Sequence, residues 1–377
     1  MKILVISGNY PSTNSPQVGT FVYNLVQEFV KQGAEVNVIS PVKYQLRKDT
    51  QVSNTYGKEL AVVHRPKRLS FSNFRFGFLN TYYFTFYFQV RAIRRAVKNL
   101  TFQPDLVYCH FLSSALYYYG AFPQSKLPIY VAVGEYYNID KVRRRFSPQF
   151  YSKLVARVNG YIAVSPQVQQ KLISLGVPNK KIIVEPNGVD LSAFKPQDKI
   201  ALRKKHGLPL HKKLVLFIGR FIENKGPLRL QNALDQLDDN VGAIFLGKGP
   251  QRPNHPKIVY SGVVAHHLVP EMMGAADVFV LPTLHEGSSN VIVEAMATGL
   301  PIISSDIPEI RFQCQPEYAI LVNPKDTNAI AAALDLVLGN DGLREQMGQK
   351  ALEASQRFDL KGRGRRILQF LERKDLL

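Results

Sequence analysis

Two glutamates separated by seven residues stand where an apolar strand gives way to a helix. Glu286 follows the apolar run at 277–281, and Glu294 lies inside the stretch 291–298, which predicts a helix. A ligand held over the start of that helix could meet one carboxylate at each end, while backbone N–H groups face its phosphates. The alternative is one acid that complements the helix dipole and a second that is simply solvated.

A pair of cations occurs after another predicted strand. Arg220 directly follows the apolar run at 213–218, and Lys225-Gly226-Pro227 opens a helix. Two cations beside a helix start can clamp a diphosphate, although two solvated surface cations would have the same spacing. Because no Asp-x-Asp follows an apolar strand, the sequence offers no evident ligands for a metal that bridges phosphates. A diphosphate here would be neutralised by Arg220, Lys225 and a helix dipole.

Two further candidates lie in the first half of the chain. Gly19 stands before a helix that starts at Thr20, and its loop lacks the closely spaced glycines of a dinucleotide fingerprint, which argues against NAD. His110 directly follows the predicted strand 106–109 and is expected to project into a cleft between domains. The alternative for His110 is a neutral imidazole that caps local backbone.

These candidates all follow predicted strands, and binding crevices of open α/β sheets lie beyond the carboxyl ends of the strands. A chain of 377 residues suits two cores of about 180 residues each. In the first half the predicted strands are 1–7, 35–40, 60–63, 106–109, 129–133, 161–164 and 182–184, with a helix over 20–32. In the second half they are 213–218, 243–246, 258–260, 278–281, 302–304 and 319–322, with helices over 227–237 and 328–338. We therefore predict an α/β fold of two Rossmann-like doubly wound parallel-sheet domains that face each other across a cleft.

Composition narrows the class of protein. Hydrophobic residues make up 45% and charged residues 20% of the chain, as in globular domains, and no window of about 20 apolar residues predicts a membrane-spanning helix. Residues 3–6 are too short a run for a signal-peptide core, so we expect a cytoplasmic protein. The two cysteines, Cys109 and Cys314, have no metal-binding or disulfide spacing.

The formal net charge of +19 is concentrated in the first half, because residues 1–192 hold 24 Lys and Arg against 9 Asp and Glu. The stretch 65–98 contains eight basic residues, no acid and ten aromatic residues, which is typical of a surface that meets an anionic membrane. Aromatic side chains packed as core are the alternative. Arg143-Arg144-Arg145 adds a second basic patch or a solvated face. A nucleic-acid-binding protein would also explain the charge, but no such fold signature is present.

Taken together, these motifs resemble the retaining glycosyltransferases of the GT-B fold, family four (group 1), over nearly the whole chain. The resemblance rests on motifs that occur in the family's order: Asn9-Tyr10-Pro11 with Gly19-Thr20-Phe21, 105–110, 185–190, 219–226, 286–297 and Gly299-Leu300-Pro301. It implies an acceptor-binding domain over 1–192, a nucleotide-sugar-binding domain over 193–357, and a last helix over 358–377 that packs back on the first domain.

The resemblance also implies roles for the candidate residues. Arg220 and Lys225 would grip the donor diphosphate, Glu294 the ribose hydroxyls and Glu286 the hydroxyls of the transferred sugar. His110 would contact that sugar from the other domain, and Gly19 would let backbone approach the phosphates. Three residues at the start of the second-half helix are candidate donor contacts: Ser288, Ser289 and Asn290. The chain departs from the family pattern where Val18 precedes Gly19 and where Ser288-Ser289 replace an aromatic or Phe-Pro.

The implied reaction moves a sugar from a nucleotide-diphosphate donor to a hydroxyl group, with retention and without a metal or other cofactor. The expected partners are the nucleotide sugar and a glycan or lipid-linked acceptor from cell-envelope synthesis, with residues 65–98 on an anionic membrane and no nucleic acid. No general base is assigned, because in this family the leaving phosphate is thought to take the acceptor proton. A GT-B epimerase or phosphorylase is the alternative within the same architecture.

Overall fold

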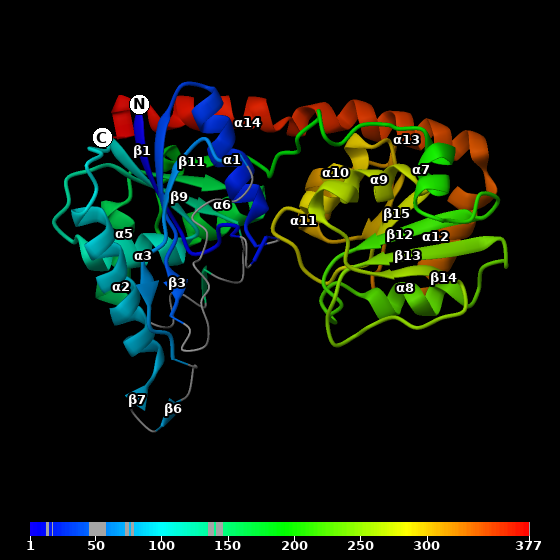
Figure 1. Ribbon diagram of the computed structural model, residues 1–377, viewed down its shortest axis with the longest axis horizontal. Coiled ribbons are helices and arrows are strands. Elements are labelled where there is room, and N and C mark those ends of the chain that lie inside the picture. Colours follow the sequence, from blue (N-terminus) through cyan, green and yellow to red (C-terminus); the bar gives the residue numbers. More distant parts are fainter. Residues whose placement is uncertain are drawn as a thin grey trace. The chain divides into compact units, whose positions relative to one another are not determined.

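The computed structural model describes residues 1–12, 15–16, 18–44, 58–71, 75–76, 79–134, 139–140 and 146–376, with the backbone alone at 75–76 and 79–80. It contains two compact units, residues 1–185 with 361–377, and residues 186–360 (Figure 1). The sequence places these divisions at 192/193 and 357/358. In the structure they lie at 185/186 and 360/361. Val189 donates to the carbonyl of Phe358 at 2.9 Å and accepts from the Leu360 N–H at 3.0 Å, so both segments fold with the second unit.

The first unit is built on a parallel sheet with the strand order β11-β10-β9-β8-β1-β2-β4. Its strands are β1 (Lys2–Ser7), β2 (Glu35–Ile39), β4 (Val62–His64), β8 (Leu106–His110), β9 (Ile129–Val133), β10 (Gly160–Ala163) and β11 (Ile182–Val184). Residues 3–6 of the central strand β1 are at most 1% exposed, because helices cover both faces of the sheet. The strand order reverses between β1 and β8, so the loops after these strands leave the sheet side by side.

Two helical layers enclose this sheet. The helices are α1 (Thr20–Lys31), α2 (Tyr82–Lys98), α3 (Leu112–Ala121), α5 (Pro148–Arg157), α6 (Pro166–Ser174) and α14 (Leu360–Leu371). α2, α3 and α5 pack together on one face. α14 lies against α1, where Gln32 donates to the carbonyl of Lys361 at 2.9 Å. Outside the main sheet, β3 (Val42–Lys43) pairs with β5 (Lys67–Arg68), and β6 (Arg75–Phe76) pairs with β7 (Leu79–Asn80).

The second unit repeats the plan around the sheet β14-β13-β12-β15-β16-β17. Its strands are β12 (Lys213–Ile218), β13 (Val241–Leu246), β14 (Ile258–Gly262), β15 (Val278–Leu281), β16 (Ile302–Ser305) and β17 (Ala319–Val322). Its helices are α7 (Lys199–Lys205), α8 (Pro227–Leu234), α9 (Val269–Gly274), α10 (Asn290–Ala297), α11 (Pro308–Gln313), α12 (Thr327–Gly339) and α13 (Asp341–Ser355). α8 and α12 pack together on one face, while α10 packs with α13. The predicted fold class of two Rossmann-like parallel-sheet domains is confirmed.

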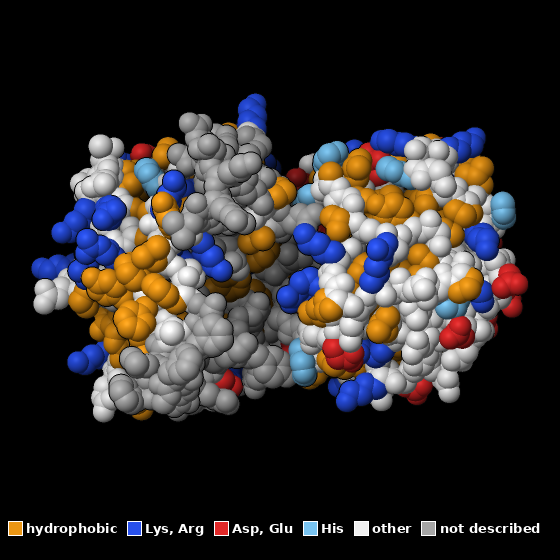
Figure 2. All heavy atoms as spheres, turned by 60° about the horizontal axis from the view of Figure 1, so that its bottom comes forward, with side chains coloured by type: hydrophobic (Ala, Val, Ile, Leu, Met, Phe, Trp, Pro, Cys, Tyr) orange, Lys and Arg blue, Asp and Glu red, His pale blue; other side chains and the backbone are white. Residues whose placement is uncertain are grey.

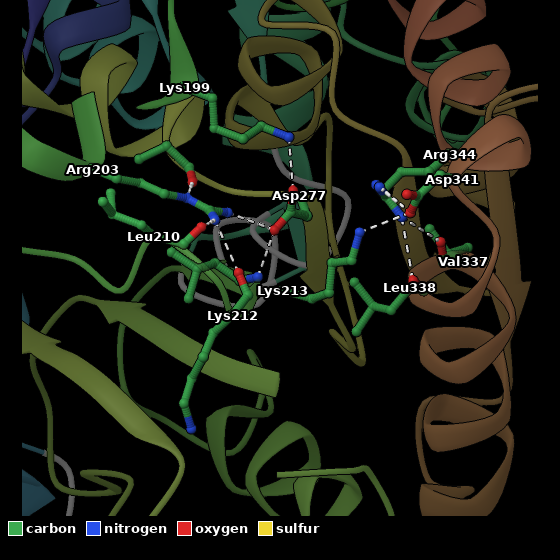
Figure 3. Close-up of polar contacts among 12 residues, drawn as sticks. Lys199, Arg203, Leu210, Lys212, Lys213, Asp277, Val337, Leu338, Asp341 and Arg344 are labelled. Atoms are coloured by element: carbon green, nitrogen blue, oxygen red, sulfur yellow. Dashed lines mark hydrogen bonds and ion pairs between the residues drawn. The ribbon is translucent and has the colours of Figure 1, made fainter. Parts of the chain in front are cut away.

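A buried ion pair fixes the amino end of the second sheet. Asp277 accepts hydrogen bonds from Arg203 at 2.6 Å, from Lys199 at 2.7 Å and from the Leu214 N–H at 2.7 Å (Figure 3). Burial alone would raise the pKa of Asp277, but Lys199, the Leu214 N–H and Arg203 together hold it below its usual value. The network ties α7 to β12 and β15, and it leaves the opposite, carboxyl edge of these strands free for loops.

Candidate functional site

Two loops meet at the carboxyl edge of the second sheet, where the strand order reverses between β12 and β15. The first loop covers 219–226 and the second 282–289. Backbone and side-chain hydrogen bonds join them: the Leu284 N–H donates to the carbonyl of Asn224 at 2.7 Å, and the Asn224 amide donates to the carbonyl of His285 at 3.0 Å. Ligands of doubly wound sheets bind at such a switch point, so these joined loops form the base of a candidate site.

Lys225 and Glu286 face each other across these loops. The Lys225 ammonium donates to the Glu286 carboxylate, and the two side chains are 20% and 9% exposed. Sequence spacing proposes both residues for the site, but it does not predict that they pair with each other. Arg220 lies on the same loop as Lys225 with its side chain exposed, so its positive charge is available to a ligand. The structure therefore brings Lys225 and Glu286 into contact and leaves Arg220 at the surface on the same loop as Lys225.

A tight backbone crossing holds this geometry. Gly226 caps α8 with a φ of 74°, and a β-carbon there would lie 2.4 Å from the carbonyl oxygen of Pro282. Only glycine fits both constraints. Arg229, one turn into α8, donates to the same carbonyl at 2.8 Å and also pairs with Glu223. Local sequence patterns do not select Arg229, although its position three residues after Gly226 on a short helix is compatible with a role in loop anchoring.

The start of α10 is held by a buried glutamine that no local sequence pattern predicts. Gln313 is fully buried and accepts from the Ser289 N–H at 2.7 Å. Its amide group donates to the carbonyl of Ser289 at 3.2 Å and to the hydroxyl of Ser288 at 3.3 Å. The Ser288 hydroxyl also accepts from the Asn187 N–H at 3.2 Å. The serine pair is thus anchored by protein groups, and its expected contact with the donor stays a prediction.

Two other polar side chains of α10 complete this edge. Within the described part of the chain, the buried carboxamide oxygen of Asn290 has no hydrogen-bond partner. Glu294 lies one turn further along the same helix and is half-buried. Burial raises the pKa of Glu294 to about 7. A carboxyl group in this state can either accept or donate a hydrogen bond near neutral pH, which suits a ligand with hydroxyl groups.

The first unit places Gly19 and His110 at its own switch point. His110 ends β8 in register with Ser7 of β1, and Gly19 caps α1 at the end of the loop that follows β1. Gly19 has a φ of 75°, and a β-carbon would lie 2.3 Å from the carbonyl oxygen of Asn9. This close approach requires glycine, and the expected contact of its backbone with a ligand stays a prediction.

His110 is enclosed by aromatic rings and is only 3% exposed. The ring centroids of Phe21 and Phe111 lie 5.3 Å and 4.7 Å from its own. Burial, together with the positive charge of Arg363 in α14, lowers the pKa of His110 to about 3. The imidazole is therefore neutral at physiological pH. Its Nδ1 atom is buried without a partner among the described residues, which differs from the alternative of a histidine that caps local backbone.

The basic and aromatic stretch 65–98 forms both core and surface. The inner face of α2 packs through Phe86, Val90 and Ile93 against the hydrophobic core of the first unit. Its outer face exposes Phe84 and Tyr87 by 51% and 56%. No helix among the described residues has the length and apolar character needed to cross a bilayer. The neighbouring patch at 143–145 lies outside the described residues.

Comparison with known proteins gives matches over both units. The family model described as "Glycosyl transferases group 1" matches residues 198–354, and "Glycosyltransferase Family 4" matches residues 18–193. The Bacillus subtilis protein TuaC, named for teichuronic acid biosynthesis, is 27% identical and aligns over 89% of this chain and 88% of its own. The phosphatidyl-myo-inositol mannosyltransferase of Mycobacterium leprae is 32% identical over 54% of this chain and 56% of its own.

Solved structures share the arrangement of elements. A sucrose-phosphate synthase from Thermosynechococcus elongatus superposes with a TM-score of 0.78 at 19% identity and covers 98% of each chain. HepE from Anabaena, solved with UDP-glucose, gives a TM-score of 0.73 at 20% identity and covers 98% of this chain and 99% of that one. These TM-scores show a common fold.

Proposed function

This chain belongs to the group 1 glycosyltransferases, and we propose that it moves a sugar from a nucleotide-diphosphate donor to a hydroxyl group of a glycan or lipid-linked acceptor. The observation that carries the proposal is the contact of Lys225 with Glu286 at the switch point of the second unit. A cation and a carboxylate held side by side match a ligand that combines a phosphate with sugar hydroxyls.

The donor would lie over the start of α10. Lys225 and the exposed Arg220 would neutralise the diphosphate, and Glu286 would accept hydrogen bonds from hydroxyls of the transferred sugar. Glu294 would meet the ribose. When the bond between the sugar and the diphosphate breaks, negative charge grows on the leaving phosphate. Fixed cations stabilise that charge more than the charge of the intact donor, and each such contact contributes about 3 kcal/mol.

The remaining parts of the reaction follow from the family resemblance. We propose transfer with retention at the anomeric carbon and without a metal ion, because Arg220, Lys225 and the α10 dipole already supply positive charge for the phosphates. The departing phosphate would take the acceptor proton. The same resemblance assigns Gly19 to the phosphates and the neutral His110 to the transferred sugar.

The acceptor belongs, in this proposal, to cell-envelope glycan synthesis, and the enzyme would work in the cytoplasm at a membrane surface. Two relatives support this setting by their names, which refer to teichuronic acid and to phosphatidyl-myo-inositol. The UDP-glucose complex of HepE supports a nucleotide-sugar donor.

A donor panel tests the proposal. The full chain is mixed with UDP-, GDP- and ADP-linked sugars, and the shift in Tm and the release of nucleotide are measured. We expect one base and sugar to be selected. Lys225→Met should lower the rate of release by about 150-fold and Glu286→Gln should also lower it, while far-ultraviolet circular dichroism stays unchanged. Lys204→Met, an exposed lysine on α7, is the matched control. Turnover at the wild-type rate in both site variants would refute the assignment, and a product that keeps its nucleotide would indicate an epimerase.

A further inference from the structure

A basic groove lies between α2 and the short β3–β5 ribbon in the first unit. It has a volume of about 280 Å³ and is called the α2 groove below. Its lining residues are Tyr44, Lys67, Arg68, Leu69, Phe88, Arg91, Ala92 and Arg95. Half of these side chains are cations and none is an acid. Neither the family comparisons nor the proposed catalytic residues account for it.

The guanidinium of Arg68 is the strongest sign of a ligand. Its Nε and Nη1 atoms are buried, and neither has a hydrogen-bond partner within the described part of the chain. A buried donor without a partner costs about 1–3 kcal/mol, and more when it carries charge, so such a group usually has an anion or water as its partner. Burial also lowers the pKa of Arg68. The arrangement suits a small anion that accepts several hydrogen bonds.

Arg91 and Arg95 form the opposite wall. They are four residues apart on α2 and therefore lie on one face of the helix, with both side chains exposed. Arg94 is exposed as well, but its guanidinium donates to the carbonyl of Ala121 at 3.0 Å. Guanidinium groups bind phosphate oxygens in pairs and cannot lose their charge, which makes a phosphate group the best match for this groove.

An apolar ridge continues directly from the groove. The ring of Phe71 lies 5.8 Å from that of Phe88, which lines the groove, and 6.0 Å from that of Phe84. Leu69, Phe71, Phe84 and Tyr87 are 43–56% exposed. Figure 2 shows hydrophobic side chains gathered on this unit with Lys and Arg side chains at their edge. A soluble sugar phosphate has no apolar part that could bury this ridge, whereas an aliphatic chain would cover it.

We propose that the α2 groove binds the phosphate group of an anionic membrane lipid, with Arg68, Arg91 and Arg95 on its oxygens and the ridge of Leu69, Phe71, Phe84 and Tyr87 among its hydrocarbon chains. The inference rests on the proposed function in one respect: it would bring the enzyme to a lipid-linked acceptor. The binding itself needs no turnover, so it is testable on an inactive variant.

Flotation of the full chain with vesicles tests the site. Binding to phosphatidylcholine vesicles is compared with binding to vesicles that also contain phosphatidylglycerol. We expect capture only by the second kind. Arg91→Gln/Arg95→Gln should weaken it about 30-fold, since each basic residue near a lipid surface contributes about 1 kcal/mol, or about fivefold. Lys126→Gln/Lys180→Gln removes the same charge from exposed positions of the same unit outside the groove and should weaken it much less.

Further variants and a soluble phosphate distinguish specific lipid binding in the groove from diffuse electrostatic attraction and from binding of a soluble ligand. Arg68→Gln should weaken capture, and Phe84→Ser/Tyr87→Ser should weaken it without changing the weak binding of glycerol 3-phosphate. Equal losses in the arginine pair and the lysine pair would overturn the proposal in favour of diffuse attraction. Glycerol 3-phosphate bound as tightly as the vesicles would overturn the lipid assignment.

The outcome is independent of the donor site. Lys225→Met should float like the wild type, and Arg91→Gln/Arg95→Gln should release nucleotide from the donor in water at the wild-type rate. Vesicle binding that survives only in active protein would contradict the groove assignment.

Discussion

Breaking the Lys225–Glu286 pair should have separable effects on stability and on catalysis. Lys225→Met leaves the Glu286 carboxylate, which is 9% exposed, without its cation. Removing one member of a fully buried ion pair costs about 3–5 kcal/mol. Because Lys225 is 20% exposed, water compensates in part, and we expect the free energy of unfolding to fall by about 2 kcal/mol. That loss corresponds to a fall in Tm of about 5 °C.

The catalytic effect should be larger. Lys225 loses its contact with the departing phosphate, which at about 3 kcal/mol lowers kcat/KM by roughly 150-fold. Glu286→Gln keeps the size of the side chain and removes its charge, so it leaves Lys225 unpaired and weakens the contacts to the sugar. Urea denaturation measures stability, and initial rates of nucleotide release with the preferred donor measure kcat/KM.

The double variant Lys225→Met/Glu286→Gln decides between a structural and a catalytic pair. With both charges gone, no uncompensated charge remains, so most of the lost stability should return. The loss in kcat/KM should persist. If stability and kcat/KM recover together, the pair serves only the loop structure, and the reasoning that places the donor phosphate at Lys225 is wrong.

Three further predictions concern the same unit. Gly207 has a φ of 64°, and a β-carbon there would meet no atom within 4 Å, so Gly207→Ala should lower the free energy of unfolding by about 1 kcal/mol. Gly226→Ala should lower it at least twice as much, because its β-carbon would also meet the Pro282 carbonyl. Urea denaturation of the two variants compares these losses. The pKa of Glu294 is raised to about 7, so between pH 4.5 and 7 the folded protein keeps a proton that the unfolded chain has released. The free energy of unfolding should therefore fall as the pH rises through this range, by about 1.4 kcal/mol per unit of pKa difference. Glu294→Gln should flatten this slope when denaturation is measured at several pH values. Gln313→Leu leaves the buried Ser289 N–H unpaired and should cost about 2 kcal/mol and raise the donor KM more than it lowers kcat; an unchanged KM would separate Gln313 from the site.

The strands of both sheets could be predicted from the sequence, because fully buried parallel strands are short apolar runs between turn residues. The strands 213–218, 278–281 and 319–322 were predicted with the bounds that the structure shows. The third strand of the first sheet was predicted at 60–63 but is β4, Val62–His64. There the Leu60 N–H bonds instead to the side chain of Gln27 at 2.9 Å, a contact between residues distant in sequence that local periodicity cannot reveal.

Only part of the candidate site could be predicted from the sequence, because the residues that hold it come from distant parts of the chain. Position after a strand was enough to select Lys225 and Glu286, since all parallel strands deliver their loops to one edge. Gln313, which anchors the start of α10, lies beyond the next strand, and Arg363, whose charge lowers the pKa of His110 in the first unit, lies in α14. Both are polar residues on amphipathic helices, where the pattern predicts solvent exposure, and only tertiary packing buries them.

The division of the chain has a consequence for its genetics. Residues 186–360 form one uninterrupted stretch, while the other unit is assembled from 1–185 and 361–377. The second unit is thus an insertion within the first, and a single continuous piece of coding sequence holds Arg220, Lys225, Glu286 and Glu294. Exchange of that cassette between homologous genes would replace the whole set in one recombination event and would leave the α2 groove untouched.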